Sequence, residues 1–316
     1  MAGHASAIAR WHIFLLLMRS LSIQSRSWLV TPGLCVLALC LAPGCACAQV
    51  NAVTLTPDVV EAGSPELIHL ESGRDARLDA DWLGRKVLFF PTHGGRDWFA
   101  LAGVDVEAPA GSSVLRVAVR SDKGSIDFSR TVEIHPAHYR TGSLTVPPKF
   151  VEPDAEALKR IEAESKLKAK VFAVSAPEPL WSGNFRAPVT SQPTDSFGTR
   201  RIFNGKLASI HKGMDFRAPM GTPVRAGNSG VVVLAQLLYY EGNCVIIDHG
   251  LGLWTLSMHL SRIDVKEGQH VAAGDRLGLS GATGRVTGPH LHWAVRWQGA
   301  YLDPAKLLRL NLSAVR

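Results

Sequence analysis

Two short stretches of the sequence offer the side chains that hold catalytic metal ions in proteins. His211 and Asp215 are separated by three residues, and His290 and His292 are separated by one. Side chains alternate along a strand, so His290 and His292 would point to the same face of one. Three such groups can bind Zn²⁺ and leave a fourth position for water, as in catalytic zinc sites. The spacing alone leaves a second interpretation open, in which these are hydrogen-bonded polar groups inside a β-rich core.

If zinc binds His211, Asp215 and His292, the expected chemistry is hydrolysis. Bound zinc lowers the pKa of a water to roughly 7 and polarises a scissile carbonyl. The sequence has no HExxH motif, so no glutamate beside the metal ligands is available as a base. His290, on the same face as His292, and His259, if the fold brings it near, could move protons and stabilise charge, because neutral imidazoles titrate near working pH.

The region that must position these residues reads as a glycine-rich β domain. Gly213 and the following Pro219 favour a loop that enters a strand over a helix between His211 and Asp215. From residue 183 onward, short apolar runs are separated by glycine-containing turns, which predicts a series of strands. The expected strands are Val231–Leu234, Val245–Ile247, Trp254–Met258, Leu277–Leu279 and Leu291–Val295.

Residues 50–135 also read as short strands, which predicts an N-terminal β-sandwich. The runs expected to form them are Val53–Leu55, Lys86–Phe90, Val114–Val119 and Ile126–Ile134. Residues 138–182 look like a connector, in which Asp154–Phe172 has apolar residues at helical spacing among many charges. The predicted fold class is therefore mainly β, with a sandwich, a helical connector and a C-terminal antiparallel sheet.

The first 48 residues resemble an export signal. Arg19 and Arg26 precede the apolar run 28–41, and Ala46-Cys47-Ala48 is an A-x-A-type cleavage site. Translation could start at Met1 or Met18, and an uncleaved membrane anchor is the alternative. We expect a cleaved signal that leaves no membrane span, and a location in the periplasm or cell envelope.

Composition and net charge limit the classes of molecule that this protein is expected to bind. The chain has 316 residues, 46% of them hydrophobic, and a net charge of +7. A mild basic excess fits attraction to an anionic polymer such as a cell wall, although it could equally have no functional meaning. No dense Lys and Arg run with interleaved aromatic residues occurs, which argues against nucleic acid. Cys244 is the one cysteine beyond the signal, and its apolar surroundings predict a buried thiol and not a nucleophile.

Four stretches of the sequence resemble a known family. They are His211-x3-Asp215, His259-Leu260, Gly278-x-x-Gly281-Ala282-Thr283-Gly284 and Gly288-Pro289-His290-Leu291-His292-Trp293. They look like the M23 peptidases, lysostaphin-like zinc endopeptidases that cut peptide cross-links of bacterial peptidoglycan. The resemblance covers about residues 183–307. The segment 144–161 also resembles the lead-in of exported M23 proteins that have an immunoglobulin-like N-terminal domain.

The resemblance implies a role for each site residue. His211, Asp215 and His292 would be the zinc ligands, and His259 and His290 the catalytic histidines. Some family members place a tyrosine shortly before the first ligand; here no clear tyrosine does so, and Asn204 lies nearby. The implied domains are a signal peptide (1–48), an immunoglobulin-like sandwich (49–137), a linker with a helix (138–182) and an M23 zinc peptidase domain (183–310).

The leading hypothesis is an exported zinc metalloendopeptidase that hydrolyses the peptide stems of peptidoglycan. The alternative is a non-catalytic module that binds the cell wall or activates an amidase. Glycine bridges and D-alanyl–diaminopimelate bonds are both substrates of the family, and the layout of signal and domains favours the second. The sequence does not determine the oligomeric state.

Overall fold

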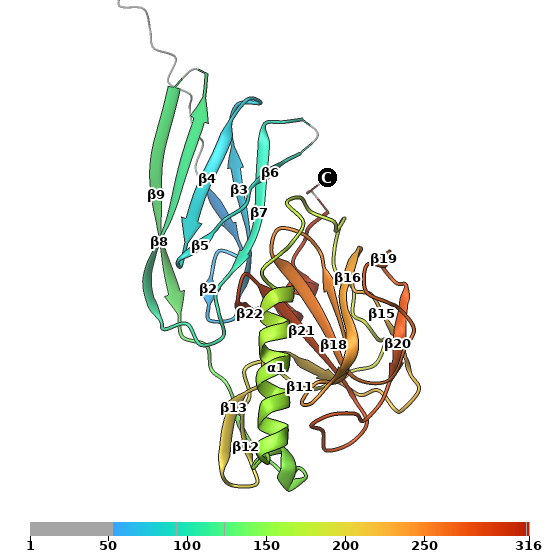
Figure 1. Cartoon of the computed structure of the whole chain (residues 1–316). Coiled ribbons are helices and arrows are strands. Elements are labelled where there is room, and N and C mark those ends of the chain that lie inside the picture. Colours follow the sequence, from blue (N-terminus) through green and yellow to red (C-terminus); the bar gives the residue numbers. More distant parts are fainter. Residues whose placement is uncertain (1–52, 93, 123, 314, 316) are drawn as a thin grey trace, which may run out of the picture. The chain divides into compact units, whose positions relative to one another are not determined.

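The structure is a computed structural model, and it describes residues 53–316 except His93, Lys123, Ala314 and Arg316. The predicted signal peptide, residues 1–48, lies outside the described residues. Most of the described elements are strands, and one long helix accompanies them (Figure 1). The predicted mainly β fold class is confirmed.

The N-terminal region is a β-sandwich of two sheets, with strand orders β1-β3-β7-β6 and β2-β9-β8-β4-β5. In β8 the residues Leu115, Val117 and Val119 are buried and their neighbours are more exposed, so apolar residues at a period of two face the core. Assignment of this sandwich to the immunoglobulin-like type stays a prediction. The strands are β1 (Thr54–Thr56), β2 (Val60–Glu61), β3 (Pro65–Glu71), β4 (Arg77–Trp82), β5 (Arg85–Lys86), β6 (Phe90–Pro91), β7 (Asp97–Gly103), β8 (Gly111–Ser121) and β9 (Gly124–His135).

The expected strand Lys86–Phe90 is wrong as a single element. Its first residue ends β5, which pairs with β4 in one sheet, and its last residue begins β6, which pairs with β7 in the other. The three residues between them belong to no strand. This apolar run is therefore the crossing between two sheets, and Val87 is buried as the chain passes from one to the other.

The connector contains a strand as well as the expected helix. Helix α1 spans Ala155–Val171 and is capped by Asp154, whose side chain accepts a hydrogen bond from the Ala157 amide at 2.8 Å. Phe172 is the C-cap, so the predicted helix Asp154–Phe172 is confirmed to within its caps. Ahead of it lie β10 (Thr141–Leu144) and a 3₁₀ turn, η1 (Pro148–Phe150).

The C-terminal region is built on a ten-stranded sheet with a main path of β11-β14-β21-β18-β17-β16-β19. All of its strand pairs are antiparallel, and each expected strand of this region is present. A smaller sheet, β10-β12-β13, joins the connector to a hairpin. The elements are β11 (Pro193–Asp195), β12 (Arg200–Phe203), β13 (Leu207–Ile210), β14 (Met214–Phe216), β15 (Pro223–Arg225), β16 (Gly230–Leu238), β17 (Gly242–Asp248), β18 (Leu253–Ile263), β19 (His270–Val271), β20 (Arg276–Ser280), β21 (Leu291–Trp297), β22 (Ala300–Leu302) and α2 (Pro304–Arg309).

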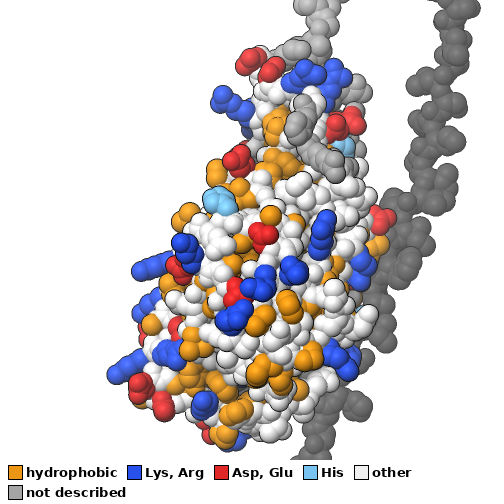
Figure 2. Space-filling view, turned by 90° about the vertical axis from the view of Figure 1, so that its right-hand side faces the viewer, with side chains coloured by type: hydrophobic (Ala, Val, Ile, Leu, Met, Phe, Trp, Pro, Cys, Tyr) orange, Lys and Arg blue, Asp and Glu red, His pale blue; other side chains and the backbone are white. Residues whose placement is uncertain are grey.

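Charges are mixed on the face of the molecule in Figure 2. Lys and Arg side chains are scattered there among acidic, hydrophobic and other polar groups, and do not form one continuous field on that face. Within the described residues, neither helix has the length and apolar content needed to cross a membrane.

Candidate metal and catalytic site

The central strands of the sheet bring Asp215 and His292 together. β14 pairs with β21, and these two residues are direct cross-strand partners. His211 lies just before β14, at the end of the β12–β13 hairpin. Gly213 makes this approach possible, because a Cβ atom there would lie 2.5 Å from His292 Nε2 and 2.7 Å from the Trp293 carbonyl oxygen.

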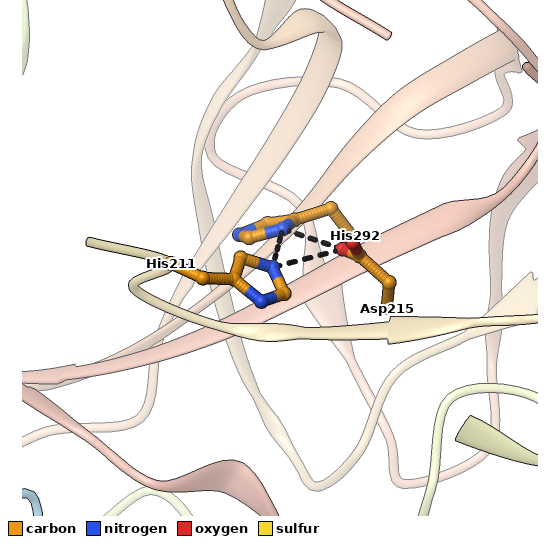
Figure 3. A group of neighbouring side chains, drawn as sticks. All are labelled: His211, Asp215 and His292. Carbon is orange, nitrogen blue, oxygen red and sulfur yellow. Dashed lines mark hydrogen bonds and ion pairs between the residues drawn. The ribbon is translucent and has the colours of Figure 1, made fainter. Parts of the chain in front are cut away.

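Three side-chain atoms of these residues meet at one point (Figure 3). His211 Nε2 lies 3.0 Å from Asp215 Oδ1 and 2.9 Å from His292 Nδ1, and the last two atoms are 2.9 Å apart. Ligand atoms about 2.0–2.1 Å from a tetrahedral zinc ion are roughly 3.3–3.4 Å from one another. A small outward shift of the three side chains would therefore give the spacing that zinc needs.

The hydrogen bonding of His211 also fits a bound cation. Its Nδ1 lies 2.9 Å from the Ser196 carbonyl oxygen, which can only accept, so Nδ1 donates the proton. Its Nε2 lies on the other side of the ring, at hydrogen-bond distance from the Asp215 carboxylate. In the neutral tautomer that the Ser196 contact selects, Nε2 is the nitrogen whose lone pair would bind a metal ion, and the Ser196 contact would hold the ring in place.

Arg201 on β12 holds the carboxylate of Asp215. Its Nη2 lies 2.5 Å from Asp215 Oδ2 and 2.6 Å from Asp195 Oδ2, so it bridges two acids. Burial alone would raise the pKa of Asp215, but the hydrogen bonds with His211 and His292 outweigh it and hold that pKa well below its usual range. Asp215 is therefore ionised, and its Oδ1 is left for the cluster.

Burial keeps His292 neutral. It lowers the pKa of this imidazole to about 4, although the nearby Asp215 carboxylate partly opposes the shift. A neutral imidazole and an ionised carboxylate are the protonation states in which these side chains bind metals.

His259 and His290 lie beside the cluster, with the ring centroid of His259 6.0 Å from that of His292 and His290 Nε2 3.8 Å from Asp215 Oδ1. His259 Nδ1 donates to the Thr283 carbonyl oxygen at 2.9 Å, and His290 Nδ1 donates to that of Gly288 at 2.8 Å. In the neutral form of either ring, Nε2 is therefore the nitrogen that has the lone pair. The two ring centroids are 4.9 Å apart.

The backbone at His259 is unusual for a residue with a side chain. Its φ is +63°, and its amide donates to the Glu241 carbonyl oxygen at 2.8 Å. Left-handed backbone at a non-glycine residue persists where the surroundings hold it, and such residues concentrate at functional sites. Burial, and then the charges of His292 and His290, lower the pKa of His259 well below its ordinary value.

A cleft of about 900 Å³ contains all five predicted site residues. The connector forms part of its wall through β10, and the β12–β13 hairpin forms another part. Asn204 in that hairpin does not reach the cluster. Its side-chain amide makes two 2.9 Å hydrogen bonds with the backbone of Val146, so it ties the hairpin to the connector.

Arg201 and Arg285 both line the cleft, and the sequence patterns predicted neither of them as a site residue. Neither belongs to a metal-ligand pattern, and each meets its partners only through the folded sheet. Two other histidines lie away from the cleft. Both ring nitrogens of buried His249 contact backbone or hydroxyl groups at 2.7 and 2.8 Å, and His270 is exposed, as predicted.

Cys244 is fully buried, as predicted. Burial raises the pKa of its thiol far above the ordinary value, so the thiolate that could act as a nucleophile does not form.

A His, Asp and His cluster with two further histidines in one cleft of an antiparallel sheet is the kind of site expected of a metal-dependent hydrolase. Comparison with known proteins agrees. The family model described as Peptidase family M23 matches residues 209–304. A solved structure from Pseudomonas aeruginosa that carries the name peptidase M23 is 30% identical, with a TM-score of 0.61, and the match covers 78% of this chain and 94% of that one. This chain belongs to peptidase family M23.

Curated relatives match part of this chain. Peptidoglycan DD-endopeptidase ShyA of Vibrio cholerae is 44% identical over 130 residues, which is 40% of this chain and 30% of the relative. DD-carboxypeptidase/endopeptidase Mpg of Neisseria meningitidis is 43% identical over 98 residues, 31% of this chain and 23% of the relative. The chain therefore spans less than a third of the length of these two curated relatives.

Proposed function

We propose that this protein is an exported zinc endopeptidase that hydrolyses peptide cross-links of bacterial peptidoglycan. The observation that supports this most directly is the complete set of five side chains, His211, Asp215, His259, His290 and His292, in one open cleft of an M23 family member. Relatives that are named peptidoglycan endopeptidases match part of this chain at 43–44% identity, which favours the same substrate class here.

His211, Asp215 and His292 would hold the zinc ion, through Nε2, Oδ1 and Nδ1 respectively. The bound ion supplies a Lewis acid that polarises a scissile carbonyl and makes a water molecule acidic near neutral pH. Arg201 keeps the second oxygen of Asp215 occupied at 2.5 Å, which leaves Oδ1 as the ligand atom. The Ser196 carbonyl fixes His211 in the tautomer that exposes Nε2.

His259 and His290 would move the protons. Since Nδ1 of each ring donates to a backbone carbonyl, Nε2 is the atom that can take a proton from water and pass it to the leaving amine. Burial favours the neutral form of His259, which is the form able to accept a proton. Once protonated, either ring can also stabilise the negative charge that develops on the substrate oxygen.

Among peptidoglycan bonds, we favour the amide that joins D-alanine to diaminopimelate. The name DD-endopeptidase on the Vibrio cholerae relative supports this choice over a glycine bridge. The export signal expected in residues 1–48 supports a location in the periplasm or cell envelope, where this bond is found.

Purified sacculi provide the test. The chain is loaded with zinc, incubated with sacculi, and the released fragments are separated by chromatography and weighed by mass spectrometry. We expect cross-linked dimers to be converted to monomers, with loss of this conversion in His290→Ala at unchanged zinc content. His270→Ala, which removes an exposed histidine outside the cleft, is the matched control and is expected to behave as the wild type.

Two outcomes would overturn the proposal. Intact cross-links after incubation with the fully zinc-loaded chain would favour a non-catalytic wall-binding or amidase-activating module. Equal cleavage by the wild type and His290→Ala would remove His290 from the mechanism.

A further inference from the structure

The charged side chains that line the cleft pair with one another almost completely. Lys212 Nζ lies 3.0 Å from Glu107, and Arg140 lies 3.1 Å from Asp195. Arg201 bridges Asp195 and Asp215, as described above. Glu241, the remaining acid of the lining, pairs with Lys168 on α1. Each of these charges is therefore balanced by a partner within the described part of the chain.

Arg285 is the exception among the described lining residues. Within the described part of the chain, no carboxylate lies within ion-pair distance of its guanidinium group, and its side chain has no hydrogen-bond partner. It rests instead against two aromatic rings, with Cζ 4.6 Å from the ring centroid of Phe203 and 4.7 Å from that of Tyr240. Up to five N–H donors thus remain available at the wall of the catalytic cleft.

A backbone hydrogen bond fixes the loop that carries Arg285. The Arg285 amide donates to the Tyr240 carbonyl oxygen at 2.8 Å, which fixes the loop between β20 and β21. The same loop contains Thr283, whose carbonyl oxygen binds His259, and it leads into His290. The unpaired cation and both predicted catalytic histidines therefore belong to one connected part of the cleft.

The surroundings of Arg285 favour an anion. Burial lowers the pKa of its guanidinium group, and the charge of Arg201 lowers it further, whereas Tyr240 and Glu241 oppose the shift. Glu241 is engaged by Lys168, so it does not neutralise Arg285 directly. A half-buried cation of this kind gains most from a planar anion that accepts two parallel hydrogen bonds, and a carboxylate is such an anion.

We propose that Arg285 binds a free carboxylate of the substrate next to the scissile amide and thereby selects stem-peptide cross-links over uncharged bridges. This inference rests on the proposed function. In an amide between D-alanine and the side-chain amine of diaminopimelate, the carbon bonded to the amide nitrogen also bears a free carboxylate. In a bridge made of glycine, the corresponding carbon bears no charged group.

The test uses a matched pair of synthetic peptides with the same D-alanyl–diaminopimelate bond. In one peptide the carboxylate beside the scissile nitrogen is free, and in the other it is a carboxamide. The zinc-loaded wild type is expected to hydrolyse the acid with a kcat/KM about 10- to 100-fold above that for the amide, since a hydrogen-bonded charge is lost. In Arg285→Gln this ratio is expected to fall close to one, because kcat/KM for the acid drops.

Two further variants separate binding from folding. Arg285→Lys keeps the charge but not the planar fork, so it is expected to retain only part of the preference for the acid. Arg217→Gln removes an exposed arginine outside the cleft and is expected to keep the full wild-type ratio. Zinc content and melting temperature are measured for every variant.

The outcomes distinguish this inference from the proposed function. Equal hydrolysis of the acid and the amide by the wild type, or an undiminished preference in Arg285→Gln, would overturn the role of Arg285 and leave the endopeptidase intact. Hydrolysis of neither peptide by the zinc-loaded wild type would overturn the proposed function, and the inference with it.

Discussion

Glu66→Gln is expected to remove a pH dependence from the stability of the fold. Glu66 lies on β3 and is fully buried, with an exposed fraction of 0%. The Ser64 hydroxyl donates to its Oε1 at 2.5 Å, and its Oε2 has no hydrogen-bond partner in the described structure. Burial raises the pKa of this carboxyl to about 8, although Ser64 and Lys306 partly oppose the shift.

The direction of the effect follows from proton binding. Below its unfolded pKa of about 4.5, Glu66 is protonated in both states and costs no stability. Between that value and about 8 the unfolded chain releases the proton while the folded chain retains it, so stability falls as the pH rises. With 1.36 kcal/mol per pKa unit, the loss between pH 5 and pH 8 is about 3–4 kcal/mol.

Denaturant unfolding at pH 5 and pH 8, followed by circular dichroism, measures this loss. The quantity of interest is the difference in unfolding free energy between Glu66→Gln and the wild type at each pH, because contributions from other titrating groups cancel in it. Between pH 5 and pH 8, the unfolding free energy of the variant is expected to rise by about 3–4 kcal/mol relative to that of the wild type. Glu133→Gln, an exposed carboxylate on β9 of the same sandwich, is the matched control and is expected to gain little.

A gain that is absent in Glu66→Gln, or equal in the two variants, would refute the reasoning that burial keeps Glu66 protonated in the fold. Parallel denaturant slopes for the wild type and the variant are needed for the comparison, since a changed slope would mean that the unfolded states differ.

Two further predictions concern the cleft. His259→Ala and His290→Ala are each expected to lower kcat by about 10²- to 10⁴-fold while one zinc ion stays bound per chain. Activity assays and metal analysis of the same samples measure both quantities. Loss of zinc together with activity would mean that the two histidines maintain the metal site and do not transfer protons. Gly213→Ala is expected to weaken zinc binding, measured by competition with a chelator, because the new Cβ would lie 2.5 Å from His292 Nε2. Gly73→Ala, where a Cβ meets nothing within 4 Å, is the control, and equal zinc affinity in both would contradict the packing argument.

Local sequence signals predicted the helix of the connector and the strands of the C-terminal sheet. Asp154 is a capping residue ahead of a helical pattern, and α1 starts directly after it. The spacing of His290 and His292 predicted that both side chains share one face, and both line the cleft, although β21 begins at Leu291 and His290 forms an isolated bridge with Gly281 just before it. The apolar run at Lys86–Phe90 was wrongly predicted to be one strand. A buried apolar segment need not pair with another strand, and this segment crosses from one sheet of the sandwich to the other.

The rest of the site depends on contacts between distant segments. His259 has no ligand spacing to any other histidine, so the sequence offered it only as a residue that the fold could bring near, and the family resemblance implied its catalytic role. Arg285 meets Phe203 and Tyr240 because three separate elements converge at the cleft wall, and no local pattern encodes that meeting. The connector was expected to be a linker, yet Thr141–Leu144 pairs with the β12–β13 hairpin and contributes to the cleft.

Identifying the bond that is cut is the decisive test of the proposed endopeptidase activity. A defined peptidoglycan dimer, joined by one D-alanyl–diaminopimelate amide, is incubated with the zinc-loaded chain, and the products are identified by mass spectrometry. We expect two monomers, one with a new D-alanine carboxylate and the other with a free diaminopimelate amine, and no such products after zinc is removed. An uncut dimer, or a cut at any other bond, would contradict this expectation.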